Sequence, residues 1–137
     1  MPRVVHFEIY ADEPDRALGF YTEVFGWTVQ KAELPSGDYW FLTTGPDDEA
    51  GINGAIMPRP DPAAKTTNYV DVPSVDDYTA KIQAAGGTVA TPKMSIPGLG
   101  YAAVCLDTEG NTFGLFEDDP SAQRRLRIPI DTPYPTL

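Results

Sequence analysis

The first residues of the chain alternate between apolar and polar side chains. Residues 4–10 repeat with a period of two, which is typical of a β-strand with two different faces. One face carries apolar side chains and the other carries polar ones: Val5, Phe7 and Ile9 against His6, Glu8 and Tyr10. Apolar residues then recur at helical spacing from Asp12 to Phe25, and Gly26 follows as a typical helix end. The pattern therefore predicts a strand followed by a helix.

Shorter patterns predict seven further strands and a second helix. In the first half they place strands at 28–31, 39–43 and 52–57. In the second half they place a strand at 67–72, a helix from the Ser74 N-cap to about Ala85, and strands at 88–90, 101–106 and 112–117. We interpret residues 92–100, which are rich in proline and glycine, as a loop.

The chain repeats itself at an offset of 60 residues. The offset places Asp47, Glu49 and Gly54 on Asp107, Glu109 and Gly114. Such a repeat indicates two copies of one supersecondary unit. We therefore expect a single domain, residues 1–137, made of two tandem β-α-β-β-β modules. Module one covers 3–58, a linker covers 59–65, module two covers 66–118 and a C-terminal arm covers 119–137.

Composition and charge exclude several classes of partner. The net charge is −10 and the pI is about 4.3, which disfavours binding to nucleic acid or an anionic membrane and suits a cationic ligand. Cys105 is the only cysteine, so an intramolecular disulfide or a cysteine-based zinc cluster is impossible, and we expect a buried core residue. We find neither a signal-peptide pattern nor a bilayer-length apolar run, and we expect a cytoplasmic protein.

Four features of the chain occur together in one known superfamily. They are the paired modules, His6 in the first strand, Phe20-Tyr21 ahead of Phe25-Gly26-Trp27, and Asp107-Thr108-Glu109-Gly110-Asn111 before the last strand. Over residues 4–118 the chain resembles the vicinal oxygen chelate superfamily, which contains the glyoxalase I, bleomycin-resistance and extradiol dioxygenase families. The resemblance implies an α+β fold whose modules form a curved mixed sheet around a central cleft, with the helices outside. It also implies a homodimer.

Enzymes of this superfamily usually bind one divalent ion in the cleft. The resemblance maps four ligand positions to His6, Gly54, Thr67 and Gly114, of which only His6 is a competent ligand. The alternative set of His6, Glu8 and Asp71 has the right donor atoms. However, His6 and Glu8 stand about 6–7 Å apart along one strand, which is wide for two ligands of one ion. We therefore expect no cofactor and disfavour a divalent metal, with His6 the only remaining candidate ligand.

The two strand glycines, Gly54 and Gly114, have two interpretations. They either leave a bare cleft floor for a flat ligand or accommodate strand curvature and packing. Around such a floor we expect aromatic and polar contacts, with Tyr39 as the alternative to Trp40. The candidate ligand-binding residues are His6, Glu8, Tyr10, Trp40, Gly54, Thr67, Tyr69, Asp71, Tyr101 and Gly114.

Two classes of function follow from this reading. The first is a protein that binds a small aromatic or cationic molecule in an aromatic-lined cleft, without a catalytic metal. The second is a lyase, isomerase or dioxygenase of the same superfamily, either metal-dependent or with His6 and Glu8 as catalytic residues. The sequence identifies neither the ligand nor the role of the arm, and it leaves open whether the modules pair within a chain or exchange between chains.

Overall fold

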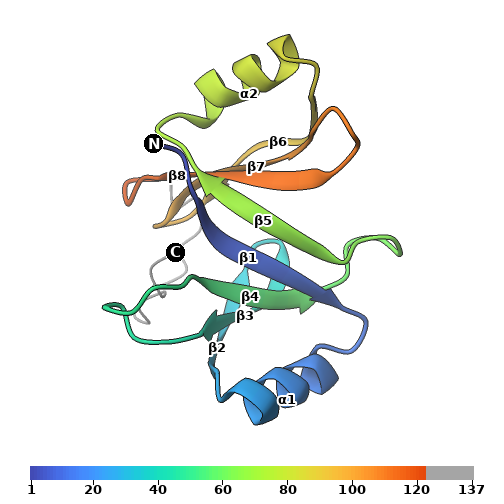
Figure 1. Ribbon diagram of the computed structural model, residues 1–137, viewed down its shortest axis with the longest axis vertical. Coiled ribbons are helices and arrows are strands. Elements are labelled where there is room, and N and C mark those ends of the chain that lie inside the picture. The colour runs from blue at the N-terminus through green and yellow to red at the C-terminus, as the bar shows by residue number, and fades with distance from the viewer. Residues whose placement is uncertain (123–137) are drawn as a thin grey trace. The chain divides into compact units, whose positions relative to one another are not determined.

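The computed structural model describes residues 1–122, which divide into two units (Figure 1). The first unit comprises residues 5–67, and the second combines residues 1–4 with residues 68–122. The first unit is built from β1 (Val4–Ala11), α1 (Pro14–Phe25), β2 (Thr28–Leu34), β3 (Gly37–Thr43) and β4 (Asn53–Pro58). The second is built from most of β5 (Thr66–Asp71), whose first two residues belong to the first unit, and from α2 (Val75–Ala84), β6 (Thr88–Ile96), β7 (Gly100–Leu106) and β8 (Thr112–Asp118).

Helix α1 covers one face of the first four strands. These strands lie in the order β2-β3-β4-β1, with β1 parallel to β4 and with β3 antiparallel to both of its neighbours. Three buried residues of this unit form the centre of the core between the strands and α1: Ala11, Leu42 and Ile56. Phe7 and Ile9 of β1 pack against this core, so the apolar face predicted for β1 is the face that meets α1.

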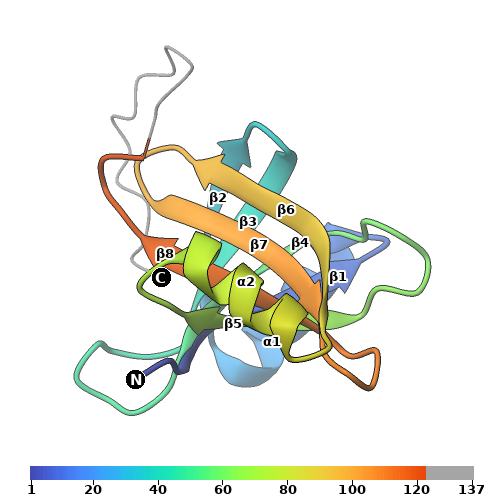
Figure 2. The ribbon, with the colours of Figure 1, turned by 90° about the horizontal axis from the view of Figure 1, so that it is seen from above.

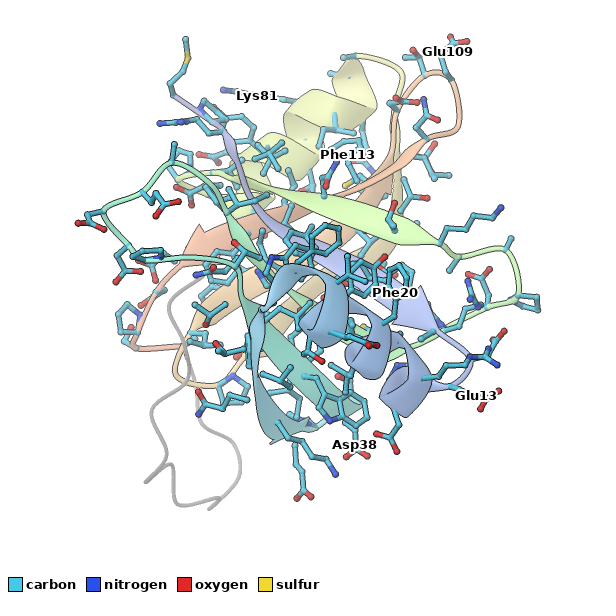
Figure 3. All side chains as sticks on the ribbon, turned by 60° about the horizontal axis from the view of Figure 1, so that its bottom comes forward. Glu13, Phe20, Asp38, Lys81, Glu109 and Phe113 are labelled. Atoms are coloured by element: carbon cyan, nitrogen blue, oxygen red, sulfur yellow. The ribbon has the colours of Figure 1, made fainter. Side chains whose placement is uncertain are left out.

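Helix α1 buries only part of its apolar surface. Its sequence offers large apolar side chains around much of its circumference, and none of its residues is fully buried. Phe20, Val24 and Phe25 are each more than half exposed, and Figure 3 shows Phe20 on this helix.

Helix α2 lies across the strands of its own unit (Figure 2). The strand order β6-β7-β8-β5 repeats that of the first unit. Two side chains satisfy backbone donors at the start of α2: Ser74 Oγ accepts from Asp77 N at 3.1 Å and Glu117 Oε1 accepts from Val75 N at 2.8 Å. Cys105 is fully buried in the core beneath α2, as predicted.

The α+β class and the β-α-β-β-β order of each half are confirmed. The predicted loop at 92–100 is wrong over its first part, because β6 continues through Pro92 to Ile96 and only residues 97–99 form a turn. The strand accommodates the proline with register shifts between Val89 and Thr91 and between Thr91 and Met94. Strand β6 is the last in the strand order and pairs on one side only, so the N–H group that proline lacks is not needed on its unpaired side.

Two further predictions concern the C-terminal arm and the absence of a membrane-spanning segment. Residues 123–137, most of the predicted arm, lie outside the described residues. Within residues 1–122, neither helix has the length and apolar character needed to cross a bilayer.

An aromatic ring covers each of the two strand glycines. A Cβ atom on Gly54 would lie 2.4 Å from the ring of Phe7, and one on Gly114 would lie 2.3 Å from the ring of Tyr69. In each pair the ring belongs to the residue directly opposite on the parallel neighbour strand. Of the two interpretations of these glycines, the bare floor is therefore wrong: a neighbouring ring fills the space of the missing side chain, and the packing interpretation holds.

We predict that Gly54→Ala destabilises the protein by about 1–3 kcal/mol, because the new methyl group must displace the ring of Phe7 from a packed core. Urea denaturation followed by circular dichroism measures the free energy of unfolding.

Gly19→Ala is the matched control for this substitution. Gly19 lies within α1 and a Cβ there would meet nothing within 4 Å, so alanine should stabilise the protein by about 0.5–1 kcal/mol. A Gly54→Ala protein as stable as its parent would contradict the assigned role of the Phe7 ring.

Candidate functional site

A hydrogen-bonded cluster of polar side chains surrounds Glu8 in the first unit. Its members come from three strands and are called the Glu8 cluster: His6, Glu8 and Tyr10 from β1, Tyr39 from β3 and Thr67 from β5. His6, Glu8 and Thr67 are 3%, 8% and 3% exposed. Because side chains alternate along a strand, the three β1 residues lie on the face away from α1. The polar face predicted for β1 is therefore the face that carries this cluster.

Two tyrosines hold the carboxylate of Glu8. Tyr39 Oη donates to Glu8 Oε2 at 2.7 Å, and Tyr10 Oη donates to Glu8 Oε1 at 2.9 Å. Both distances lie in the normal range for O–H···O hydrogen bonds. His6 Nε2 lies 2.9 Å from Tyr39 Oη, and Thr67 Oγ1 lies 2.8 Å from Tyr10 Oη. Each tyrosine thus links the carboxylate to one further polar side chain.

Burial fixes the protonation state of two members of the cluster. It lowers the pKa of His6 from 6.5 to about 4, so the imidazole is neutral near pH 7. Burial, together with the negative charge of Glu8, raises the pKa of Tyr10, so its phenol keeps its proton.

Two predicted site residues of the first unit lie on the opposite face of the strands. Trp40 is paired with Ile56 in the α1-facing core, and its ring lies 5.5 Å from Lys31 Nζ. Gly54 is paired with Phe7 on the same face. Neither shares the face of His6 and Glu8. Tyr39, which the sequence offered as the alternative to Trp40, supplies the hydroxyl group of the cluster.

The predicted site residues of the second unit have different surroundings. Tyr69 covers Gly114, whereas Asp71 is exposed at the end of β5. Tyr101 packs against the core beneath α2, with Lys93 Nζ 4.4 Å from its ring centroid. Lys93 also forms an ion pair with Asp76 at 2.9 Å, so its position has a structural explanation.

The donor atoms near His6 do not fit the metal site expected from the resemblance. Within residues 1–122, no three His, Cys, Asp or Glu side chains lie close enough together to hold a metal ion. Gly54 provides no donor and lies on the other face, while Thr67 has its hydroxyl bonded to Tyr10. Both carboxylate oxygens of Glu8 accept phenol protons.

We predict that acid weakens the fold through His6. Between pH 6.5 and about 4 the unfolded chain binds a proton at this histidine and the folded chain does not, so the free energy of unfolding falls as the pH falls. Below pH 4 this effect lowers the free energy of unfolding by about 3 kcal/mol relative to neutral pH. Urea denaturation of the parent and of His6→Gln between pH 7 and pH 4 measures the loss.

Glutamine at position 6 keeps a donor for Tyr39 but does not titrate in this range, so the variant should lose stability less steeply. If the free energy of unfolding falls equally with pH in the two proteins, His6 is not the group that titrates.

The comparisons with known proteins agree with the order of elements. Residues 3–115 match the family described as the Glyoxalase/Bleomycin resistance protein/Dioxygenase superfamily. The Mycobacterium tuberculosis protein CFP32, described as "Putative glyoxylase", is 34% identical over 117 residues, which cover 82% of this chain and 43% of that protein. YurT of Bacillus subtilis is 36% identical over 64 residues, which cover 46% of this chain and 50% of YurT. The chain therefore spans half or less of the length of these two relatives.

Solved structures show the same fold at low sequence identity. A superfamily member from Vibrio splendidus 12B01 has a TM-score of 0.61 at 17% identity, covering 87% of this chain and 100% of its own. Methylmalonyl-CoA epimerase from Mycobacterium tuberculosis has a TM-score of 0.64 at 13% identity, covering 86% of this chain and 89% of its own. The family match, the relatives and the fold agree: this chain belongs to the Glyoxalase/Bleomycin resistance protein/Dioxygenase superfamily.

Proposed function

We propose that the protein binds a small organic molecule, cationic or aromatic, at the Glu8 cluster and does so without a divalent metal. The observation that carries the proposal is the buried carboxylate held by the hydroxyl groups of Tyr10 and Tyr39. Burying an ionisable group is costly, and such groups gather at functional sites.

The charge and the aromatic content of the protein favour the same kind of ligand. A net charge of −10 attracts cations to the surface before they bind. Tyr10 and Tyr39 place two aromatic rings beside the carboxylate, and each well-placed ring contributes about 0.5–2 kcal/mol to the binding of a cation. A homodimer and a cytoplasmic location stay predictions.

The alternative is an enzyme of the glyoxalase type, in line with the description of CFP32. In that case Glu8 would take a proton from a substrate as a general base. Both oxygens of its carboxylate already accept a phenol proton, so a substrate would first have to displace Tyr10 or Tyr39. The arrangement favours binding over proton abstraction.

We predict that charge decides which probes bind. Benzyltrimethylammonium, benzyl alcohol and benzoate share a ring and differ in charge. Titrated into isotope-labelled protein, the cation should shift the amide NMR signals of β1 and β3 most strongly, because it meets the carboxylate of Glu8. Benzoate should shift them least.

Glu23→Gln is the matched control for Glu8→Gln, because Glu23 is exposed on α1 and its loss changes the net charge equally. Glu8→Gln should weaken the response to the cation, and Glu23→Gln should leave it unchanged. If no probe shifts the signals of β1 and β3, or if benzoate binds as well as the cation, the proposed site is wrong.

We also predict that the protein holds no stoichiometric divalent ion. Elemental analysis of protein purified without chelator or nickel resin, followed by calorimetric titration with nickel, zinc, manganese and iron(II), measures this. One tightly held ion per chain that is lost in His6→Gln would overturn the proposal and support the enzyme.

A further inference from the structure

The solvent-facing side of helix α1 carries a regular set of side chains. Five exposed residues recur at the helical spacing i, i+3, i+4, i+7 and i+8, and we call them the α1 face: Arg16, Gly19, Phe20, Glu23 and Val24. The opposite side of the helix packs on the core through Ala17, Leu18 and Tyr21. In Figure 3 α1 lies in front of the strands of its own unit, with Phe20 labelled. The α1 face is therefore directed to solvent.

Two large apolar side chains of this face are in contact with water. Phe20 is 56% exposed and Val24 is 55% exposed. The ring of Phe20 meets the ring of Tyr21 edge-on, with centroids 5.1 Å apart, and Tyr21 in turn stacks on Trp27 at 5.4 Å. Phe20 is thus held in position before a partner arrives, which lowers the entropy cost of burying it in an interface. Aromatic side chains are frequent anchors of protein interfaces.

The charges of the α1 face make it complementary to itself. Arg16 precedes Glu23 by two turns, which is about 10 Å along the helix axis. When a second copy of the helix packs antiparallel about a two-fold axis through the midpoint, each Arg16 faces Glu23 of the other copy. A parallel pair would instead place like charges opposite each other. The antiparallel arrangement also opposes the dipoles of the two helices.

The same two-fold axis brings Phe20 of one copy to Gly19 of the other, because these two residues lie on either side of the midpoint between Arg16 and Glu23. A Cβ atom on Gly19 would meet nothing of its own chain within 4 Å, so the surface there is open. A ring that faces a residue without a side chain lets two helices approach closely. Shape and charge therefore favour the same arrangement.

The ion pair that Arg16 forms within its own helix leaves it available to a partner. Arg16 Nη1 lies 3.0 Å from Glu13 Oε2, and the two side chains are 74% and 65% exposed. An ion pair as exposed as this one contributes little to stability, because water screens both charges. Arg16 therefore exchanges Glu13 for a carboxylate of a second copy at small cost.

We propose that the α1 face is a docking surface for a second copy of this chain, with the two helices antiparallel. Phe20 of each copy covers Gly19 of the other. Two ion pairs join Arg16 to Glu23 across the interface. Because one helix from each copy forms a small contact, we expect a dimer that dissociates on dilution. The proposal is independent of the proposed ligand site, since the Glu8 cluster lies on the face of the strands away from α1.

Reversing one charge at a time gives the sharpest test. Arg16→Glu and Glu23→Arg each place two pairs of like charges in the interface, so each variant alone should have a dissociation constant about tenfold above that of the parent. In an equimolar mixture of the two variants every facing pair again has opposite charges, and the heterodimer should form as tightly as the parent dimer. Analytical ultracentrifugation over a range of concentrations measures these constants. Physiological ionic strength screens the net charge of −10 on each chain beyond about 8 Å.

Lys81→Glu is the matched control, because Lys81 is exposed on α2 and its reversal changes the net charge as much as Arg16→Glu does. This variant should form the dimer as the parent does. Phe20→Ala removes the apolar anchor and should raise the dissociation constant at least about tenfold. Since Phe20 is exposed, this variant should keep the fold, which circular dichroism checks.

Three outcomes would overturn the proposal. The first is a parent protein that is monomeric at every concentration. The second is a dimer that Phe20→Ala does not weaken. The third is a mixture of Arg16→Glu and Glu23→Arg that associates no better than either variant alone. None of these outcomes involves a ligand, so they leave the proposed function to its own test.

Discussion

The polar side chains of the first unit are arranged around the carboxylate of Glu8. A buried carboxylate is tolerated only when hydrogen bonds replace the water it has lost. Here two phenols supply them, at 2.7 and 2.9 Å, and each phenol is supported by a further side chain. Through these bonds His6, Tyr10, Tyr39 and Thr67 are all linked to the one carboxylate.

Strand β1 serves the core and the cluster at the same time. Phe7 and Ile9 pack with α1, while Glu8 between them points to the other face. A shift of one residue in the pairing of β1 would bury Glu8 in the apolar core and remove Phe7 from Gly54. The ring of Phe7 lying across Gly54 disfavours such a shift, since it fits only where the neighbouring strand lacks a side chain. The glycine that sequence reasoning placed in the site therefore helps to set the strand register on which the site depends.

The elements and one face of the site could be predicted from the sequence because they depend on local spacing. Alternation alone brought His6, Glu8 and Tyr10 to one face. Choosing Tyr39 over Trp40 required the register between β3 and β4, where Trp40 is opposite Ile56. Alignment of the two repeats matched Gly54 with Gly114 by residue type, yet Gly54 lies on the helix-covered face and Gly114 on the face away from α2, with Tyr69. A repeat in sequence does not fix the face on which a residue lies, because a strand offset by one residue reverses it.

The likeness of this chain to metal-binding members of its superfamily does not extend to the ligand positions. Two of the four positions that the resemblance maps to metal ligands carry glycine, and at a third the hydroxyl group of Thr67 is hydrogen-bonded to Tyr10. Glu8 accepts hydrogen bonds from Tyr10 and Tyr39 with both of its carboxylate oxygens. The β-α-β-β-β framework is therefore retained while the donor set is not, because a divalent ion needs several nitrogen, sulfur or carboxylate ligands and residues 1–122 bring no three His, Cys, Asp or Glu side chains together.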